Sequence, residues 1–302
     1  MGIFKKKETL VENMTYMGLM AAINVVFVLL TTFVPFLFFL IVFVLPLTST
    51  IVALHCEKRY FPIYAFATVG LCFLVTIWHI DDTLFYVIPS IITGFVFALL
   101  IEKKISSQWI IILTTIIQVG FTYLSIPIIK GLFNRDIVHD FAVVFGLGDF
   151  KYLNYLAPAF IFVLALVQEI LSYIVISEEI KRFGFEINEP KLISYPMMLG
   201  LLISGLFTLL FGFVFPELSY AFLLVDLYFA AFLFVGLMKK KKIWIYISLL
   251  AGFIVSFFLF ALTYKSIPAP LGLLMISIFF LFILIIVFID NCLSKNNNKD
   301  TI

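Results

Sequence analysis

The sequence is poor in charged residues, in cysteine and in recognisable catalytic motifs. Charged residues make up 13% of its 302 residues, against roughly 25% in soluble globular domains. Its three cysteines stand far apart without a CxxC pair, which argues against a disulfide framework or a zinc site. The chain also lacks P-loop, GxSxG and HExxH motifs. We therefore expect no enzymatic activity, no cofactor, no bound metal and no nucleic-acid partner.

The chain is instead rich in apolar residues. They make up 64% of the chain, and phenylalanine alone accounts for 38 residues. A water-soluble fold of this length has too little interior to bury so much apolar surface. The apolar stretches are continuous and do not alternate with polar residues, as they would in a transmembrane barrel. The composition therefore predicts an integral membrane protein built of helices.

Ten apolar segments are long enough to cross a bilayer. A helix needs about 20 residues to span a hydrocarbon core about 30 Å thick. The segments are 14–34, 36–54, 60–78, 84–101, 109–129, 155–176, 195–215, 220–238, 243–262 and 269–289. The sixth helix could end at residue 176 or run on to Glu179 or beyond. The predicted fold class is all-α, a polytopic transmembrane helical bundle of about ten helices.

The basic residues indicate how this bundle is oriented. Cytoplasmic loops of membrane proteins carry an excess of Lys and Arg. With the N-terminus in the cytoplasm, 16 of the 20 Lys and Arg residues fall on the inner side and four on the outer side. The sequence therefore predicts a multi-pass protein of the cytoplasmic (plasma) membrane with both termini in the cytoplasm.

The connecting segments divide the chain into parts. Residues 1–13 form a predicted cytoplasmic N-terminus, and residues 14–180 a unit of six helices. The longest inner loop separates this unit from a four-helix C-terminal membrane unit at 195–290. The polar residues 291–302 are expected to form a disordered cytoplasmic tail.

Two carboxylates fall inside apolar segments. Glu169 lies near the middle of the sixth segment and Asp226 in the outer part of the eighth. An ionised carboxylate at such depth costs about 3 kcal/mol on insertion scales, so each is expected to face the bundle interior or to be protonated. One interpretation is a carboxylate that binds substrate or couples transport. The alternative is a neutral side chain hydrogen-bonded to a neighbouring helix.

A further group of polar residues is predicted at the outer face. Trp78, His79 and Asp81 follow the third segment, and Arg135 and His139 lie in the long outer stretch 130–154. That stretch is too apolar for a flexible linker. We expect it to be re-entrant or to lie on the surface of the helical bundle. The group could bind a solute or a divalent cation. The alternative, which we favour, is that these residues form a solvated loop without a binding role, with the Trp in the aromatic belt at the membrane interface.

Small residues mark one side of the first helix. Gly18 and Ala22 are four residues apart, with Ala21 beside them, and small side chains let helix backbones approach closely. Such a face can bind a partner helix, although packing within one bundle is its commoner use. Asn24 on the same helix is expected to make an interhelical hydrogen bond. Pro46 is expected to kink the second helix.

Several short motifs carry a resemblance to a known family. They are KETLVE (7–12), GLMAA (18–22), Pro35, FVLPL (43–47) and the turns EKR (57–59) and EKK (102–104). With these motifs, roughly residues 8–180 resemble the S components of energy-coupling factor (ECF) vitamin transporters. They resemble the YybS-type membrane proteins more closely, which carry an S-component-like half plus extra helices.

The resemblance implies a function. It implies an S-component-like six-helix unit with a substrate pocket that opens outward, followed here by four extra helices. It also implies that the first helix, through Gly18 and Ala22, meets a transmembrane coupling subunit driven by two ATPases. The leading hypothesis is binding or uptake of a small solute with partner subunits. The alternative is a non-transporting scaffold or accessory subunit of a larger membrane complex.

Overall fold

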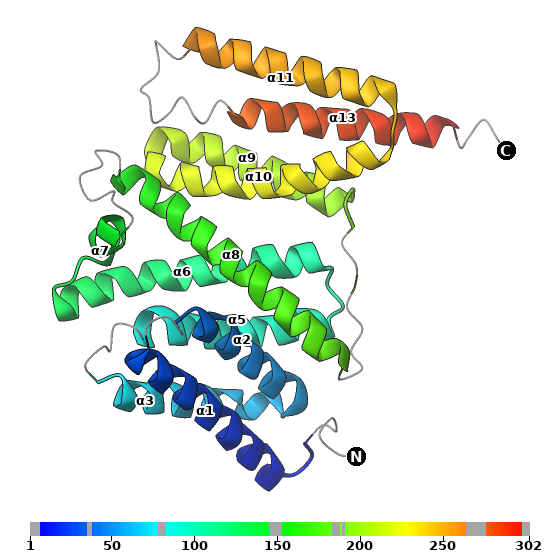
Figure 1. The fold of residues 1–302 in the computed structure, drawn as a ribbon. Coiled ribbons are helices and arrows are strands. Elements are labelled where there is room, and N and C mark those ends of the chain that lie inside the picture. The colour runs from blue at the N-terminus through cyan, green and yellow to red at the C-terminus, as the bar shows by residue number, and fades with distance from the viewer. Residues whose placement is uncertain are drawn as a thin grey trace. The chain divides into compact units, whose positions relative to one another are not determined.

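The computed structural model describes residues 7–34, 38–77, 83–144, 153–182, 188, 191–263 and 276–297. These residues contain eleven α-helices, a 3₁₀ turn (η2, Lys58–Tyr60) and a π-helical turn (η3, Thr83–Val87), and no β-strand (Figure 1). The α-helices are α1 (Leu10–Phe33), α2 (Phe38–His55), α3 (Phe61–Val75), α5 (Ile88–Glu102), α6 (Ser107–Phe133), α7 (Ile137–Val144), α8 (Leu153–Arg182), α9 (Tyr195–Val214), α10 (Pro216–Lys239), α11 (Ile243–Thr263) and α13 (Ile276–Asn297). The predicted all-helical class is confirmed.

Seven of the described helices are long and apolar enough to cross a membrane. They are α1, α6, α8, α9, α10, α11 and α13. The protein is therefore a multi-pass integral membrane protein, as the composition predicted. Each of the ten predicted segments overlaps a described helix, but α3 and α5 have only 15 residues each. Ten crossings thus remain a prediction.

The distribution of side chains is that of a protein in lipid. Large apolar side chains lie on the surface, among them Phe66 at 82% and Leu74 at 71% exposure. Polar side chains such as Asn24 and Thr93 are fully buried. In water such large exposed apolar surfaces would cause association. In lipid they are solvated, and hydrogen bonds between buried polar groups help to hold the helices together.

The described contacts divide the chain into two compact units. Unit 1 comprises residues 1–146 and 164–190, and unit 2 comprises residues 147–163 and 191–302. Within unit 1, α1 packs against α2 and α3, α2 against α5, and α5 against α6 (Figure 1). The short helix α7 contacts α6 and occupies part of the stretch 130–154, which was predicted to lie outside the membrane and to be re-entrant or surface-lying.

Local sequence explains where these helices begin and end. Thr9 and Glu12 form a capping box, in which each side chain accepts a hydrogen bond from the other residue's backbone N–H. Helix α1 therefore begins at Leu10, four residues before the predicted apolar segment. Asn134 adopts a left-handed conformation (φ 53°) and ends α6. Helix α8 runs on to Arg182, six residues beyond the predicted sixth segment.

A buried hydrogen-bond network joins the first three helices of unit 1. The Asn24 amide donates to the Tyr64 hydroxyl over 2.8 Å and accepts from the Thr48 hydroxyl over 2.6 Å. The Ser49 hydroxyl lies 3.3 Å from the same Tyr64 oxygen. The expectation that Asn24 bonds to another helix is confirmed. Because every member is buried and paired, the network favours one register between α1, α2 and α3.

Unit 2 is built around a tight helical hairpin. Helices α9 and α10 are separated only by Phe215 and pack along each other, and α13 packs against both (Figure 1). Helix α11 packs against α13. Helix α13 continues to Asn297, beyond the residue at which the sequence predicted a disordered tail. Residues 298–302 lie outside the described residues.

Candidate functional site: the polar cluster around Glu169

Glu169 lies in the second half of α8, within unit 1. Its side chain is fully buried, as the sequence predicted for a carboxylate at this depth. Neither of its carboxyl oxygens has a hydrogen-bond partner among the described residues. Buried polar groups are almost always paired, and an exception calls for an explanation such as a bound ligand or water. Glu169 is therefore the centre of the candidate site.

Two threonine hydroxyls are the polar groups that face the Glu169 carboxyl. They belong to Thr114 on α6 and Thr93 on α5. Each of these hydroxyls also lies within hydrogen-bonding distance of a carbonyl oxygen of its own helix. Thr114 donates to the Ile110 carbonyl over 2.9 Å, and Thr93 donates to the Ser90 carbonyl over 3.1 Å. A hydroxyl has only one hydrogen to give. Each threonine can therefore donate either to its own helix or to the Glu169 carboxyl, but not to both, so two hydroxyls only partly satisfy an ionised carboxylate.

A relay of amides crosses the same three helices beside Glu169. The Gln118 amide nitrogen on α6 lies 3.5 Å from the Gln168 amide oxygen on α8. The Gln168 nitrogen in turn lies 3.5 Å from the Ser90 hydroxyl on α5. These bonds are long, and the Gln118 amide oxygen has no partner among the described residues. The cluster therefore has spare hydrogen-bonding capacity on both the carboxyl and the amides.

The cluster carries no compensating positive charge. The apolar parts of its three helices, residues 88–101, 107–129 and 156–178, contain no Lys, Arg or His. An ionised Glu169 would be an isolated charge in a low-dielectric interior, at a cost of about 3 kcal/mol or more. The site therefore suits either a neutral carboxyl or a ligand that brings hydrogen-bond donors or positive charge. An anionic ligand would meet only repulsion from an ionised carboxylate.

The structure places the predicted partner face of α1 on the surface of the chain. Gly18 and Ala22 are exposed, and no described atom lies within 4 Å of the position a Gly18 Cβ would take. Ala21 points the other way and is buried at 3% exposure. The three residues therefore do not share one face. Gly18 and Ala22 are not used for packing among the described residues, and Ala21 is.

The predicted outer group is only partly described. Trp78, His79 and Asp81 lie outside the described residues. Arg135 is exposed and forms an ion pair with Asp140, with a distance of 3.2 Å. His139 is also exposed, at the start of α7. No cluster of three His, Cys, Asp or Glu residues that could hold a metal occurs in the described part of the chain.

The connection between α6 and α7 is stabilised by charge. Lys130 pairs with Asp136 over 3.0 Å, and the His139 backbone N–H donates to the same carboxylate over 3.1 Å. The bond from Lys130 and the bond from His139 together hold the pKa of Asp136 below its usual value. The carboxylate also lies at the N-terminus of α7, where the helix dipole favours negative charge. The charged residues described here thus pair with one another.

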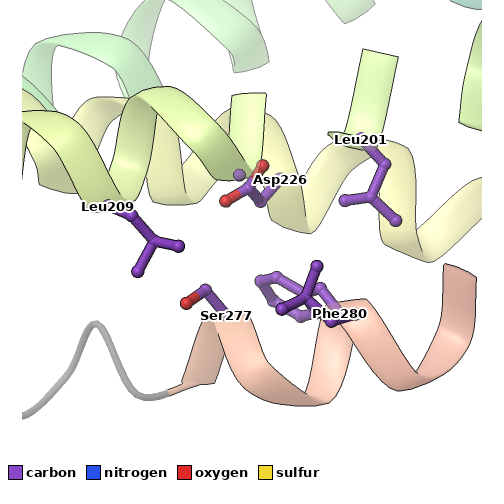
Figure 2. A pocket seen from close by; sticks show the side chains of 7 residues that line it. Leu201, Leu209, Asp226, Ser277 and Phe280 are labelled. Atoms are coloured by element: carbon purple, nitrogen blue, oxygen red, sulfur yellow. The ribbon is translucent and has the colours of Figure 1, made fainter. Parts of the chain in front are cut away.

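Asp226 occupies a second buried site, which lies in unit 2. Its side chain is 1% exposed, and its carboxylate accepts hydrogen bonds from Ser204 and from Thr208, the latter over 2.8 Å. It borders a small cavity between α9, α10 and α13 (Figure 2). Like the threonines near Glu169, Ser204 and Thr208 also lie within hydrogen-bonding distance of carbonyl oxygens of their own helix. Glu169 and Asp226 are described in different units, so the structure does not join them into one site.

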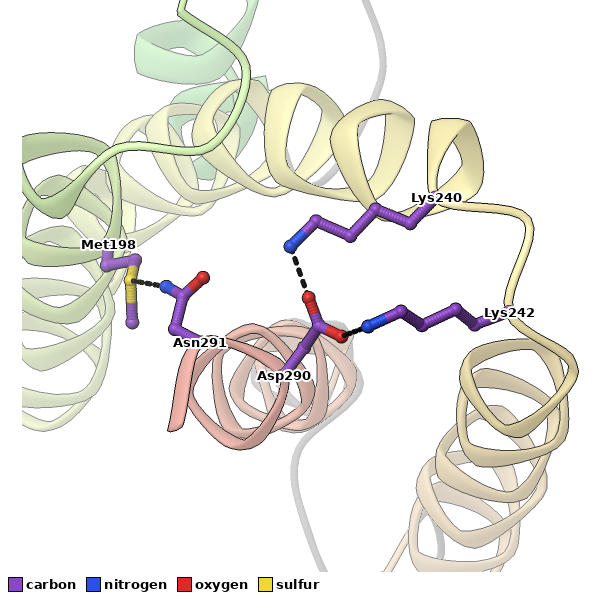
Figure 3. A network of polar contacts seen from close by, with 5 residues as sticks. All are labelled: Met198, Lys240, Lys242, Asp290 and Asn291. Atoms are coloured by element: carbon purple, nitrogen blue, oxygen red, sulfur yellow. Dashed lines mark hydrogen bonds and ion pairs between the residues drawn. The ribbon is translucent and has the colours of Figure 1, made fainter. Parts of the chain in front are cut away.

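Two buried polar features were not singled out from the sequence. Gln118 is a polar residue in the middle of the fifth apolar segment, and the argument used for Glu169 would have found it. Asp290 follows the last predicted segment as the final residue of the predicted C-terminal unit. In the structure it is fully buried and pairs with Lys240 and, over 2.7 Å, with Lys242 (Figure 3). No sequence signal connects residues 50 positions apart.

Comparisons with protein-family models, with curated proteins and with solved structures gave no match for this chain. The class that the fold defines is that of a multi-pass, all-helical integral membrane protein. Any narrower assignment depends on the residues described above.

Proposed function

We propose that this protein is a solute-binding membrane protein that takes up a small polar molecule through the Glu169 cluster of unit 1. The main observation that supports this proposal is that Glu169 is fully buried and that neither of its carboxyl oxygens has a hydrogen-bond partner among the described residues. In this proposal the chain crosses the cytoplasmic membrane ten times, with both termini in the cytoplasm. The distribution of its Lys and Arg residues supports this orientation.

The chemistry of the cluster limits the class of solute. The site offers one carboxyl, two primary amides and several hydroxyls, and its helices carry no cation in their apolar parts. These groups match a neutral or cationic solute rich in N–H or O–H donors. Binding such a solute would give the Glu169 oxygens the partners they lack. An anionic solute would need basic side chains that these segments do not have.

The proposed uptake follows an S-component-like scheme with partner subunits. The chain has no P-loop, so energy for uptake has to come from ATPase partners or from an ion gradient. The exposed Gly18 and Ala22 on α1 support contact with a transmembrane coupling subunit, because small residues allow a second helix to approach closely. Cross-linking mass spectrometry on native membranes tests this contact. Recovery of no ATPase or coupling subunit would count against coupled uptake.

Native mass spectrometry tests solute binding directly. The full chain is purified gently from its own membranes, and the spectrum is searched for a small-molecule adduct at one copy per chain. We expect the adduct on the wild-type protein and its loss from Glu169→Gln, which keeps the side-chain shape and removes the carboxyl. Glu179→Gln is the matched control, because Glu179 lies on the same helix but pairs with Arg182 at the surface. Equal adducts on all three proteins would refute the proposal.

The second candidate function is a scaffold or accessory subunit without transport. The exposed face of Gly18 and Ala22 favours it, since this face would serve assembly equally well. Ala22→Leu is expected to disrupt assembly and leave the stability of the isolated chain unchanged. Ala21→Leu, one residue away but buried, is expected to destabilise the chain itself. Intact function in Glu169→Ala and Asp226→Ala, together with loss in Ala22→Leu, would favour the scaffold over the transporter.

A further inference from the structure

A row of buried polar side chains leads away from Glu169 along α6. Its members are three or four residues apart and therefore share one face of the helix. This polar row consists of Thr114, Gln118, Thr122 and Ser125, each at most 8% exposed. The row begins at Thr114, whose hydroxyl faces the Glu169 carboxyl. At 1.5 Å per residue, the step from position 114 to position 125 covers about 16 Å, about half of a hydrocarbon core about 30 Å thick.

Other polar groups adjoin the row along its length. Gln118 lies beside the amide of Gln168, which in turn lies beside Ser90, and its own amide oxygen has no partner among the described residues. At the far end of the row, the Ser125 hydroxyl donates to the Leu84 carbonyl in η3 over 3.1 Å. Such π-helical turns occur frequently at functional sites. Polar side chains with spare hydrogen-bonding capacity can hold bridging water, which carries protons.

Toward the opposite ends of the three helices, the surroundings of Glu169 are apolar. Helices α5, α6 and α8 contribute here to one buried cluster. Its members from these helices include Phe97 and Ile101 of α5, Ile110 of α6, and Ile176 and Ile180 of α8, all at most 4% exposed. Ser172 of α8 lies between Glu169 and this cluster and has an interaction within the chain. Glu169 therefore has a polar route toward the Ser125 end of α6 and an apolar barrier toward the Ser107 end.

Glu169 is the group in this region whose charge can change near neutral pH. The apolar parts of the three helices are residues 88–101 of α5, 107–129 of α6 and 156–177 of α8. Besides Glu169, their titratable side chains are Tyr123 and Tyr173, which are neutral at pH 7. Carboxyl groups inside membrane segments mark proton relays and ion pathways. A proton needs only the one carboxyl as its ligand, and its binding removes the costly charge.

We propose that Glu169 is a proton-binding site that exchanges its proton with one side of the membrane through the polar row. In the orientation proposed above this side is the outside, because α6 follows the inner turn 102–104 and runs outward to Ser125. A carboxyl that is loaded with protons from one side can couple a proton gradient to movement across the membrane. The inference needs no solute at Glu169, and it goes beyond solute binding by naming an energy source.

Carbodiimide labelling of the full chain in sealed, right-side-out membrane vesicles tests the proposal. Dicyclohexylcarbodiimide enters lipid and reacts with a carboxyl group that is protonated. The carboxyl proton moves to a nitrogen of the reagent, and the carboxyl oxygen bonds to its central carbon. Peptide mass spectrometry measures the adduct on Glu169 while the pH is varied separately outside and inside. Glu169→Gln should abolish this adduct, and Asp226→Asn should leave it unchanged.

The expected result is a response to the pH of one side. Once the outer pH passes the value at which the carboxyl ionises, labelling of Glu169 should fall about tenfold for each further pH unit. An equally alkaline pH inside the vesicles should have no effect. Labelling that ignores the pH of both sides would overturn the proposal, and so would labelling that follows both sides equally.

Variants of α6 test whether the polar row is the route. Gln118→Leu removes the amide but keeps a side chain of similar size, so the response to a jump in outer pH should slow at least severalfold. Thr122→Val removes a hydroxyl at nearly constant shape and should act in the same direction, which keeps the test decisive if Gln118→Leu does not fold. Gln108→Leu is the matched control, because it makes the same change beyond Ile110, away from the row. Wild-type kinetics in both Gln118→Leu and Thr122→Val would overturn the route.

The accessibility of Cys292 in the same vesicles separates the route from the orientation. A response to inner pH with Cys292 reachable from outside would support the route in a chain of reversed orientation. A response to inner pH with Cys292 inside would overturn the proposal. Solute binding is scored separately by native mass spectrometry, so loss of the solute adduct with an intact proton response would refute solute binding alone.

Discussion

Gly94 of α5 lies directly against the backbone of Pro46 in α2. A Cβ on Gly94 would come within 2.5 Å of the Pro46 carbonyl oxygen and within 2.6 Å of the Ser49 Cβ. The Thr50 hydroxyl lies between the two backbones, 2.7 Å from the Pro46 oxygen and 2.9 Å from the Gly94 oxygen. The two helices therefore meet backbone to backbone, and the absence of a side chain at position 94 permits it.

Gly94→Ala is expected to destabilise unit 1. The added methyl group overlaps backbone atoms, which cannot move aside as a flexible side chain can, so α2 and α5 have to separate. Overpacking of this kind costs about 1–3 kcal/mol. Thermal or denaturant unfolding of the purified chain in detergent measures the change. Gly70→Ala is the control, because its Cβ meets no described atom within 4 Å and alanine favours a helix. Wild-type stability in Gly94→Ala would contradict the close packing.

Glu169→Gln is expected to leave the stability of the chain unchanged or to raise it. Glutamine has nearly the same shape, carries no charge, and can donate to the hydroxyl oxygens of Thr93 or Thr114. Glu169→Ala should instead lose about 1–3 kcal/mol, because it leaves the neighbouring amides and hydroxyls facing an empty space. The measurement is again the unfolding temperature in detergent. A large loss of stability in Glu169→Gln would show that the native carboxylate is ionised and paired, contrary to the structure.

The ion pairs of Asp290 should respond asymmetrically to mutation. The aspartate is fully buried, whereas Lys240 and Lys242 are 31% and 44% exposed (Figure 3). Asp290→Asn leaves two lysines that can turn to solvent, at a cost of about 1 kcal/mol or less. Replacing both lysines by Met leaves a buried carboxylate without partners, at a cost of about 1–3 kcal/mol.

Unfolding of the three variants side by side measures this asymmetry. Met substitutions at Lys239 and Lys241 are the matched control, because they remove two charges from the same turn and leave the pairs with Asp290 in place. The control should unfold like the wild type. Equal losses in Asp290→Asn and in the double replacement of Lys240 and Lys242 would contradict the unequal burial of the partners.

The predicted orientation can be tested with a native cysteine. Cys292 is exposed near the end of α13, while Cys56 and Cys72 are buried. In the proposed orientation Cys292 faces the cytoplasm. A membrane-impermeant maleimide should therefore label it only after cell lysis. Arg135→Cys, in a Cys292→Ser background, should be labelled in intact cells, because position 135 is exposed and the proposed orientation puts it outside the cell. Labelling of Cys292 in intact cells would show that the topology is the opposite of the one proposed.

The helical class could be predicted because lipid leaves the backbone little choice. A segment inside a bilayer has to satisfy its own N–H and C=O groups, so a long apolar run becomes a helix. Helix ends were less predictable. The predicted apolar segment of α1 began at residue 14 and left out Glu12. The helix begins at Leu10, because Glu12 and Thr9 form a capping box at its N-terminus. The predicted sixth segment ended at residue 176, whereas α8 ends at Arg182, because charged residues can extend a helix beyond its apolar run.

The candidate site could be predicted only in part. Glu169 and Asp226 stood out because a carboxylate is costly in an apolar segment. Thr93 and Thr114 did not, since a threonine in a transmembrane helix usually bonds to its own backbone, as both do here. What makes them important is that they lie at Glu169. One step along a helix turns a side chain by about 100°, so Ala21 and Ala22 could be expected to point in different directions. Only the structure shows which of the two is buried.

The amino-acid sequence by itself determined that this chain is an integral membrane protein, that it is helical, and where charged residues interrupt its apolar segments. Those properties follow from the composition and from the length of each apolar segment, which can be read without knowing any contact between distant residues. Only the tertiary structure decided that Gly94 meets Pro46, that Asp290 pairs with Lys240 and Lys242, and which polar groups surround Glu169 and Asp226. These contacts depend on the register between helices distant in sequence, and close packing of whole side-chain surfaces sets that register.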